Sequence, residues 1–312
     1  LILSYLRDYG GMTAAERLDI PMVSFGSLES PIRVEGIDPP FGSGVSRDAP
    51  KRMLQLMWKL HHEFNYKVDE IYNETIRRPQ GLGDICGVST LHSNKLLLLS
   101  SISALSNKNS PEPPHIKYVG SLFSRKFESV EADEDEQIAR INSSQQPKIF
   151  VSLGTTFVKP MMGKCLKALE TFPGTIIVSL GGENARDFGS LLERKNVIWR
   201  SFFYDVNSVF KRVDAVVTVT AAKTVLASLA AGKPLVCVPQ QGEQYERAYM
   251  LQSLGAGEVP CPRGWDSLRF ARVTEQVAME SRYAEAASVL QADVNQSGGV
   301  ADVVRLINRY LP

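Results

Sequence analysis

The sequence offers little to a metal ion or to a disulfide framework. Its four cysteines (Cys86, Cys165, Cys237 and Cys261) lie far apart, and no two of them have CxxC spacing. Cys165 and Cys237 fall in apolar helix and strand contexts, where a thiol usually serves as a small core side chain. The sequence therefore predicts neither a metal site nor disulfide bonds, and we expect a reducing, cytoplasmic setting.

Strong net charge and long apolar runs are also absent. The formal net charge of +1 at pH 7 gives no electrostatic footprint for nucleic acid or an anionic membrane. No segment approaches the roughly 18 consecutive apolar residues of a membrane span. We therefore expect no nucleic-acid partner and no transmembrane segment. The 312 residues are enough for two domains, each with its own core.

The chain begins without an initiating methionine and in the middle of an apolar run. Residues 1–6 are typical of a buried strand, and a helix at 12–18 and a strand at 21–25 follow. A domain that starts inside its own sheet would leave strand edges uncovered. We therefore expect that the natural protein has residues upstream of Leu1 and that the first domain lacks its first part.

Residues 1–124 are expected to form this first domain. The segment 26–50 contains several prolines and glycines and is long for a loop inside a compact domain. Residues 51–78 carry apolar side chains at three- and four-residue steps, which predicts a long amphipathic helix. Short strands are expected at 96–99 and at 118–122, the second of which leads out of the domain.

The segment 125–146 is expected to be a linker. It is acidic between Glu131 and Glu136 and polar from Asn142 to Gln146. Charge runs of this kind are usually solvated surface rather than binding sites.

The second domain, 147–312, is predicted to alternate apolar strands with helices. Strands are predicted at 148–153, 175–180, 197–202, 215–219 and 235–239, and helices at 161–171, 185–194, 206–212, 221–231, 243–254, 267–279, 282–294 and 300–310. This alternation is typical of a parallel sheet covered by helices on both faces. The short connections predict a doubly wound α/β sheet with right-handed crossovers.

The start of the helix at 221–231 is the first candidate binding element. Thr220 precedes it as an N-cap candidate. The free N–H groups of the first turn and the positive end of the helix dipole would hold an anion. The turn comprises Ala221, Ala222, Lys223 and Thr224. The two small alanines allow a ligand to approach the backbone, the lysine supplies a cation, and the threonine supplies a hydroxyl. An ordinary capped helix with Lys223 in solvent would contain the same residue types.

Two further loops open at the same edge of the predicted sheet. Gly154 and Thr155 form a small, hydroxyl-bearing turn, although an ordinary strand-to-helix turn would have the same composition. Glu243 and Gln244 begin a helix, where an acid suits the dipole and where both side chains could bind sugar hydroxyls. Ligands of such sheets bind at the carboxyl ends of the strands. Three converging loops therefore suit a diphosphate with a polar group at each end.

These motifs make the second domain similar to the donor-binding domain of the GT-B glycosyltransferases, in particular the large family that uses UDP-sugars. The matching residues are 150–155, 196–197, 203–205, 214–217, 224–226, 230–234, 239, 243–244, 247–248 and 255–257. The first domain resembles the later half of the acceptor-binding domain of that family through residues 14–21 and 118–122. The resemblance covers most of the chain and is specific in the second domain.

Several positions depart from the family's pattern. Members usually have a histidine and a glycine-rich turn before the helix that meets the diphosphate, where this chain has Val219-Thr220-Ala221-Ala222-Lys223. The glutamate that commonly contacts the ribose falls at Ala227. The proline–glutamine pair that flanks the base is replaced by Tyr204-Asp205. The acid–glutamine pair that binds the sugar is retained as Glu243-Gln244, and Arg247 replaces the usual asparagine after it.

The resemblance implies two Rossmann-like domains that face each other across a cleft. It also implies an inverting, metal-independent transfer of a sugar from a nucleotide diphosphate, expected to be UDP, to a hydroxyl of a small hydrophobic acceptor. The nucleotide sugar would be a co-substrate, and no cofactor is expected. The family's general base, normally a histidine near the N-terminus, would lie upstream of Leu1.

The resemblance also gives roles to the candidate residues. Lys223 and Thr224 would stabilise the departing diphosphate, with Lys223 supplying the charge of the missing histidine. Gly154 and Thr155 would frame the cleft, and Tyr204 would lie near the uracil. Two alternatives stay open. The altered phosphate loop also suits a catalytically inactive glycosyltransferase-like binding protein, and a sugar-nucleotide epimerase of the same architecture would process the donor without an acceptor.

Overall fold

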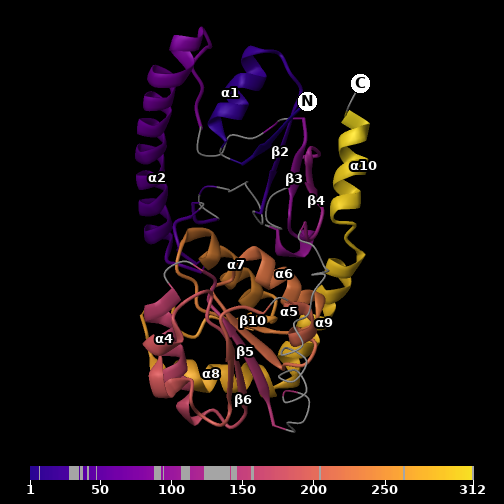
Figure 1. The fold of residues 1–312 in the computed structure, drawn as a ribbon. Helices are drawn as coiled ribbons and strands as arrows, with labels where there is room; N and C mark the ends of the chain where they lie inside the picture. The colour runs from indigo at the N-terminus through magenta and orange to yellow at the C-terminus, as the bar shows by residue number, and fades with distance from the viewer. Residues whose placement is uncertain are drawn as a thin grey trace. The chain divides into compact units, whose positions relative to one another are not determined.

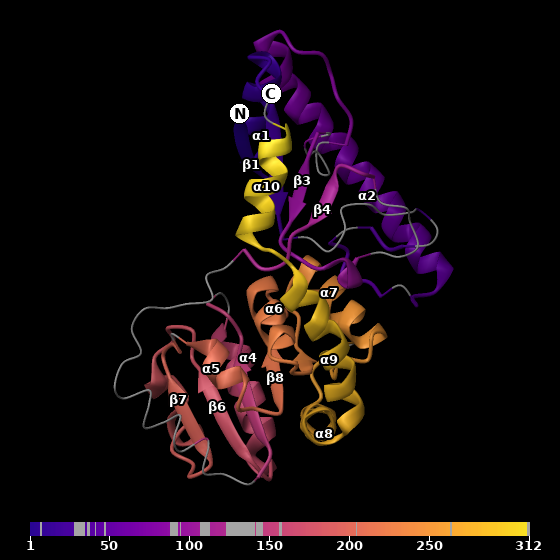
Figure 2. The same ribbon diagram turned by 90° about the vertical axis from the view of Figure 1, so that its right-hand side faces the viewer.

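The chain folds into two compact α/β units. A computed structural model describes residues 1–6, 8–27, 35, 38–40, 42–46, 48–87, 93, 95–106, 113–122, 141, 146–155, 158–203, 205–262 and 264–310. One unit contains Leu1–Leu122 and Ser297–Pro312, and the other contains Phe123–Gln296. Each unit has its own parallel β-sheet (Figures 1 and 2). The α/β class that the sequence predicts is therefore confirmed.

The first unit has a four-stranded parallel sheet in the order β1-β2-β3-β4. Its strands are β1 (Ile2–Tyr5), β2 (Met22–Gly26), β3 (Leu97–Leu99) and β4 (Ile116–Tyr118). These strands lie side by side in chain order. The described part of this sheet therefore does not contain the reversal of strand order that defines a doubly wound sheet. The strand expected at 118–122 instead ends at Tyr118, because Gly120 turns the chain with a φ of +76°.

The helices of this unit are α1 (Tyr9–Arg17) and α2 (Lys51–Tyr72). The single helix predicted over 51–78 is interrupted after α2 by a π-helical turn, η1 (Asn73–Arg77), and a 3₁₀ turn, η2 (Arg78–Gln80). Asp8 caps α1 by accepting a hydrogen bond from the Gly11 N–H at 3.0 Å.

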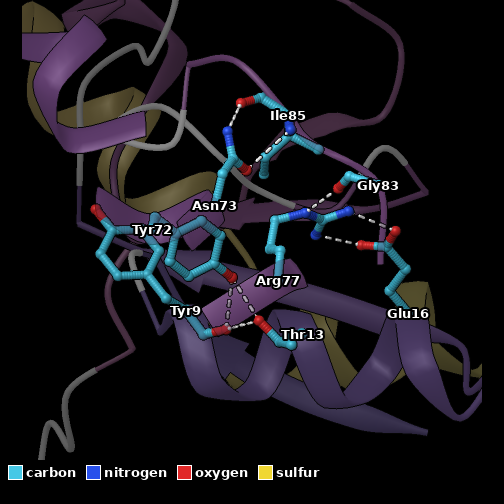
Figure 3. A network of polar contacts seen from close by, with 8 residues as sticks. All are labelled: Tyr9, Thr13, Glu16, Tyr72, Asn73, Arg77, Gly83 and Ile85. Atoms are coloured by element: carbon cyan, nitrogen blue, oxygen red, sulfur yellow. Dashed lines mark hydrogen bonds and ion pairs between the residues drawn. The ribbon is translucent and has the colours of Figure 1, made fainter. Parts of the chain in front are cut away.

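A polar network with a buried Arg77 and an exposed Glu16 explains the π-helical turn (Figure 3). Arg77 is 2% exposed and binds Glu16 through two hydrogen bonds of 2.7 and 2.8 Å. Its Nε also donates to the Gly83 carbonyl at 2.6 Å. Asn73 exchanges two hydrogen bonds with the backbone of Ile85, at 2.9 and 3.1 Å. Because both side chains must reach these partners, the wider i→i+5 turn is favoured where the sequence alone predicts a continuous α-helix.

The same network continues to α1 through three hydroxyl contacts. The Tyr72 hydroxyl donates to the Thr13 hydroxyl and lies 3.1 Å from the Tyr9 carbonyl. The Thr13 hydroxyl in turn donates to the Tyr9 carbonyl at 2.7 Å. The end of α2 is thereby fixed against the first two turns of α1 (Figure 3).

The second unit has a six-stranded parallel sheet in the order β10-β9-β8-β5-β6-β7. Its strands are β5 (Lys148–Ser152), β6 (Thr175–Ser179), β7 (Val197–Arg200), β8 (Ala215–Thr218), β9 (Leu235–Cys237) and β10 (Gly257–Glu258). Counted from β5, this is the 3-2-1-4-5-6 order of the doubly wound dinucleotide-binding sheet. The two-residue strand β10 is too short for periodicity to predict it.

Two hydrophobic cores cover the two faces of this sheet. Alternate residues along each strand point to opposite faces, so Ile149 and Val151 of β5 enter one core and Phe150 enters the other. The helices are α4 (Val158–Ala168), α5 (Val206–Phe210), α6 (Ala222–Ala230), α7 (Gly242–Ser253), α8 (Ser267–Met279) and α9 (Ser281–Gln296). Residues of α4 and α8 pack into the first core, and residues of α5 and α6 pack into the second.

Two details of this unit differ from or extend the prediction. The helix expected at 185–194 is a pair of 3₁₀ turns, η6 (Ala185–Asp187) and η7 (Gly189–Leu191), because Gly189 adopts a φ of +47° and interrupts the helix. Cys165 and Cys237 are core residues, as predicted, and burial raises the pKa of both thiols.

The C-terminal helix α10 (Val300–Tyr310) belongs to the first unit, although the sequence places it with 147–312. It packs its apolar face on the first sheet through Val303, Leu306 and Ile307, next to Val23 and Leu98. Its amphipathic pattern predicts the helix but does not specify which sheet it covers. Of the linker expected at 125–146, the structure describes only residues 141 and 146. In the described part of the chain, no helix combines the length and apolarity that a membrane crossing requires.

Candidate functional site

The strand order of the second sheet reverses between β5 and β8, which pair from Ile149–Ala215 to Ser152–Thr218. Ligands of doubly wound sheets bind at the carboxyl ends of the strands, where the order reverses. Gly154 and Thr155 follow β5, and Thr220 follows β8, so both predicted loops flank this position. The loops are adjacent, since a Cβ atom on Gly154 would lie 3.9 Å from Cγ2 of Val219.

The turn after β5 is also in backbone contact with the turn after β6. A Cβ atom on Gly181 would lie 1.9 Å from the carbonyl oxygen of Gly154. Gly154 and Gly181 have φ angles of +80° and +66°, in the left-handed region that favours glycine. The glycines thus allow a close approach of the two backbones and set the position of Thr155, whose side chain is exposed.

Helix α6 begins without a side-chain cap. The N-cap residue is Ala221, with φ −61° and ψ 136°, and not Thr220 as the sequence predicts. Because Thr220 has a φ of +62°, its side chain turns away from the helix. The first N–H groups of a helix have no intrahelical acceptor. Those of Ala222, Lys223 and Thr224 lie in this turn, where they and the helix dipole can bind an anion.

Thr220 is strained and fully buried, with 0% exposure. A left-handed conformation of a β-branched residue costs about 1–3 kcal/mol. The Thr220 hydroxyl donates to the Gln244 carbonyl at 2.7 Å, and its N–H donates to the Thr218 hydroxyl at 3.3 Å. Its carbonyl accepts from Nη1 of Arg247. Net contributions of about 1 kcal/mol for a neutral bond and 1.5–3 kcal/mol for a charged one are enough to offset the strain.

The first turn of α7 has one half-buried and one buried polar side chain. Glu243 is half-buried and accepts a hydrogen bond from Nε2 of Gln241 at 3.2 Å. Gln244 is 8% exposed, and its Oε1 accepts from the Gln240 N–H at 2.8 Å. The amide oxygen that was expected to bind a sugar hydroxyl is therefore used within the protein, which leaves the NH₂ group as the donor of this side chain.

The positions expected near the base are only partly described. Tyr204 lies outside the described residues. Its neighbour Phe203 packs in the core with a ring-centroid distance of 5.6 Å to Phe150. Asp205 caps α5 by accepting from the Ser208 N–H at 3.1 Å. Phe203 therefore contributes to the core, and Asp205 contributes to the cap of α5.

Two residues at this edge have no role in the sequence-based prediction. Phe202 follows β7, is 44% exposed, and would contact a Cβ atom on Gly182 at 3.1 Å. Arg247 is 2% exposed and reaches the loop after β8 from α7. Arg247 lies three residues after Gln244 on the same helix face. This spacing could have indicated from the sequence that both residues face the same loop. Among the described residues, no group of three or more His, Cys, Asp or Glu side chains could hold a metal ion.

Comparison with curated proteins finds glycosyltransferases. The chain is 27% identical over 169 residues to the demethyllactenocin mycarosyltransferase of Streptomyces fradiae, covering 53% of this chain and 36% of that protein. It is 24% identical over 205 residues to the ecdysteroid UDP-glucosyltransferase of Choristoneura fumiferana defective polyhedrosis virus, covering 64% of this chain and 41% of that protein. The matches therefore span less than half of the length of these relatives. No protein-family model matches the chain.

Solved structures match a larger share of the chain. The calicheamicin glycosyltransferase CalG4 matches 99% of this chain and 74% of its own, with a TM-score of 0.72 and 19% identity. The spinosyn rhamnosyltransferase SpnG complexed with thymidine diphosphate matches 98% of this chain and 72% of its own, with a TM-score of 0.65 and 19% identity. These similarities confirm the GT-B fold and the resemblance that the sequence indicates.

Proposed function

We propose that this protein is a glycosyltransferase that transfers a sugar from a nucleotide diphosphate donor to a hydroxyl of a small hydrophobic acceptor. The observation that carries the proposal is the start of α6, which has no side-chain cap and lies at the order reversal of a doubly wound sheet. The similarity to proteins named as a mycarosyltransferase and a UDP-glucosyltransferase supports it.

The diphosphate is assigned to the first turn of α6. The N–H groups of Ala222, Lys223 and Thr224 would donate to its oxygens, and the exposed Lys223 would add a positive charge. The N-terminus of a helix stabilises an anion by about 0.3–1 kcal/mol, and by up to about 2 kcal/mol where the site is partly buried. The Thr224 hydroxyl would supply a further hydrogen bond to the same phosphates.

The nucleoside is assigned to the side of β6 and β7, and the sugar to the side of α7. Neighbouring strands are about 4.8 Å apart, so the loops from β8 to β7 extend over roughly 14 Å, a span that suits an extended nucleoside diphosphate. Gly154 and Thr155 would lie along it. In the other direction, Glu243 and the NH₂ group of Gln244 would bind sugar hydroxyls.

The proposed reaction is an inverting transfer without a metal. A base removes the proton of the acceptor hydroxyl as its oxygen bonds to the anomeric carbon. The bond from that carbon to the phosphate oxygen breaks, and the nucleoside diphosphate leaves with the electron pair. The start of α6 would stabilise the charge that develops on this leaving group, and such fixed donors typically contribute 10²–10³-fold to the rate. UDP is the proposed nucleotide, with dTDP as the comparison because SpnG was solved with thymidine diphosphate.

One observation favours a second function, a binding protein that performs no turnover. Thr220, a strained β-branched residue, occupies the loop where the resembled family has a glycine-rich turn. Calorimetry of the chain with UDP, dTDP and UDP-glucose tests donor binding, and product analysis of the protein expressed from its complete natural gene, with and without hydroxylated acceptors, tests turnover. Binding with acceptor-dependent sugar transfer supports the glycosyltransferase. Binding without turnover supports the alternative, and consumption of the donor without an acceptor would indicate an epimerase or a hydrolase instead.

A further inference from the structure

We propose that Arg247 is a positioning residue for the donor diphosphate. Together with the backbone of Gln244, it holds Thr220 in a left-handed conformation, and this conformation directs the first turn of α6 toward the ligand. The inference rests on the proposed function, because it concerns the same donor site. It assigns a role to a buried cation that lies outside the predicted set of donor-binding residues.

The conformation of Thr220 determines where α6 begins. Thr220 lies one residue before the N-cap Ala221, which is extended with φ −61° and ψ 136°. The change from a φ of +62° at Thr220 to this extended residue reverses the chain between β8 and α6. If Thr220 relaxed to a negative φ, Ala221 would be displaced, and the N–H groups of Ala222 to Thr224 would no longer point to one place at the sheet edge.

Each backbone polar group of Thr220 has a partner that favours this conformation. The N–H donates to the Thr218 hydroxyl at 3.3 Å, and the carbonyl accepts from Nη1 of Arg247. The side-chain hydroxyl donates to the Gln244 carbonyl at 2.7 Å. Gln244 and Arg247 are three residues apart on α7 and therefore face the loop together. A threonine is thus kept in a region that usually requires glycine.

The charge of Arg247 adds to this geometric effect. The residue is 2% exposed, and Thr220 is fully buried, so the guanidinium group contacts the loop from within the protein. Water screens a buried charge less than an exposed one, so its field extends further. A diphosphate on the outer side of the same turn would be attracted by it. A change at Arg247 should therefore weaken binding of the phosphates more than binding of the nucleoside.

The test compares Arg247→Gln, Thr220→Gly and the double variant in the full chain. Calorimetry gives the dissociation constant of UDP or dTDP, whichever binds the wild type more tightly, and NMR titration gives that of the matching nucleoside. We expect Arg247→Gln to weaken diphosphate binding at least tenfold and to leave nucleoside binding within twofold. Thr220→Gly should bind like the wild type, and the double variant should recover most of the loss, because glycine adopts the left-handed conformation unaided.

Other outcomes separate the inference from the proposed function. If Arg247→Gln does not fold, Thr220→Val serves in its place, since valine lacks the hydroxyl and disfavours a positive φ. It should weaken diphosphate binding while Thr220→Gly does not. The inference is overturned if the folded Arg247→Gln or Thr220→Val variant binds the diphosphate like the wild type, or if its affinities for the diphosphate and the nucleoside fall equally. It is also overturned if adding Thr220→Gly to Arg247→Gln restores no diphosphate affinity. A wild-type protein that binds no nucleoside diphosphate would overturn the proposed function, and this inference with it.

Discussion

The hydroxyl of Thr220 donates a hydrogen bond to the main-chain carbonyl of Gln244, 2.7 Å away. This contact joins the loop after β8 to the first turn of α7, which are the elements assigned to the diphosphate and to the sugar. Since Arg247 of the same helix binds the Thr220 carbonyl, the two elements form one connected structure. A change in α7 that releases Thr220 from its left-handed conformation should therefore affect donor binding at the start of α6.

Substitutions in the first turn of α6 should weaken donor binding. We expect Lys223→Ala and Thr224→Val each to raise the dissociation constant of UDP about two- to tenfold, because each removes a favourable contribution of roughly 0.4–1.4 kcal/mol to the diphosphate. Calorimetry measures the change. Lys233→Ala is the matched control, because Lys233 follows the carboxyl end of the same helix, and it should bind like the wild type. Equal effects at Lys223 and Lys233 would contradict the assigned position.

Gly181→Ala should destabilise the second unit and displace the turn after β5. The new Cβ atom would meet the Gly154 carbonyl oxygen at 1.9 Å, and the φ of +66° adds strain. We expect a loss of about 2–4 kcal/mol in the free energy of unfolding, measured by urea denaturation. Gly163→Ala is the control, because Gly163 lies in α4 with nothing within 4 Å of an added Cβ. That change should be neutral or should stabilise the protein by up to about 1 kcal/mol.

The Glu16–Arg77 pair should make stability depend on pH. The hydrogen bond from Arg77 holds the pKa of Glu16 below its usual value of 4.5. A carboxyl group with a lowered pKa contributes its stability above the unfolded-state pKa and loses it as the pH falls through the folded-state pKa. Glu16→Gln should therefore lower the melting temperature at pH 7, and the difference from the wild type should shrink below about pH 4.5.

The size of that effect follows from the burial of the two partners. The Arg77 side chain is 3% exposed and that of Glu16 is 51% exposed. We therefore expect a loss on the order of 1–2 kcal/mol, less than for a fully buried pair. Asp84→Asn is the control, because the Arg78–Asp84 pair is exposed on both sides, and its effect should be much smaller. A difference that grows as the pH falls toward 3 would contradict the assignment.

The packing of α10 predicts which sheet a change in this helix affects. Leu306→Ala should cost about 1–2 kcal/mol, because its side chain is only partly buried against Val23 and Leu98. Hydrogen exchange should speed up in β2 and β3 and remain unchanged in β5 and β8. Val304→Ala is the control, since Val304 is 53% exposed. Faster exchange in the second sheet instead would show that α10 is packed elsewhere.

Much of the second unit could be predicted because its elements are specified locally. The helix expected at 267–279 is observed as Ser267–Met279, and all five predicted strands begin at the observed residue. Strands that are apolar throughout can only be buried on both faces, which leads directly to a parallel sheet between helix layers. The observed strand order then brings the predicted loops after β5 and β8 together.

The remaining features depend on contacts that are distant in sequence. The π-helical turn at Asn73–Arg77 requires Glu16, which is 61 residues away from Arg77. The conformation of Thr220 requires Gln244 and Arg247, which are 24 and 27 residues away. A threonine with a positive φ is rare, so local propensity predicts an N-cap at this position. Only the tertiary contacts reveal that Ala221 is the N-cap.

Binding of the diphosphate at the start of α6 is tested most directly by following the backbone amides of this helix during a titration with UDP. ¹⁵N-labelled protein gives one signal for each N–H group, and calorimetry under the same conditions gives the dissociation constant. We expect the signals of Ala222, Lys223 and Thr224 to shift the most among those of α6 and to follow the calorimetric binding curve. Saturable binding of UDP that leaves these three signals unmoved would contradict this expectation.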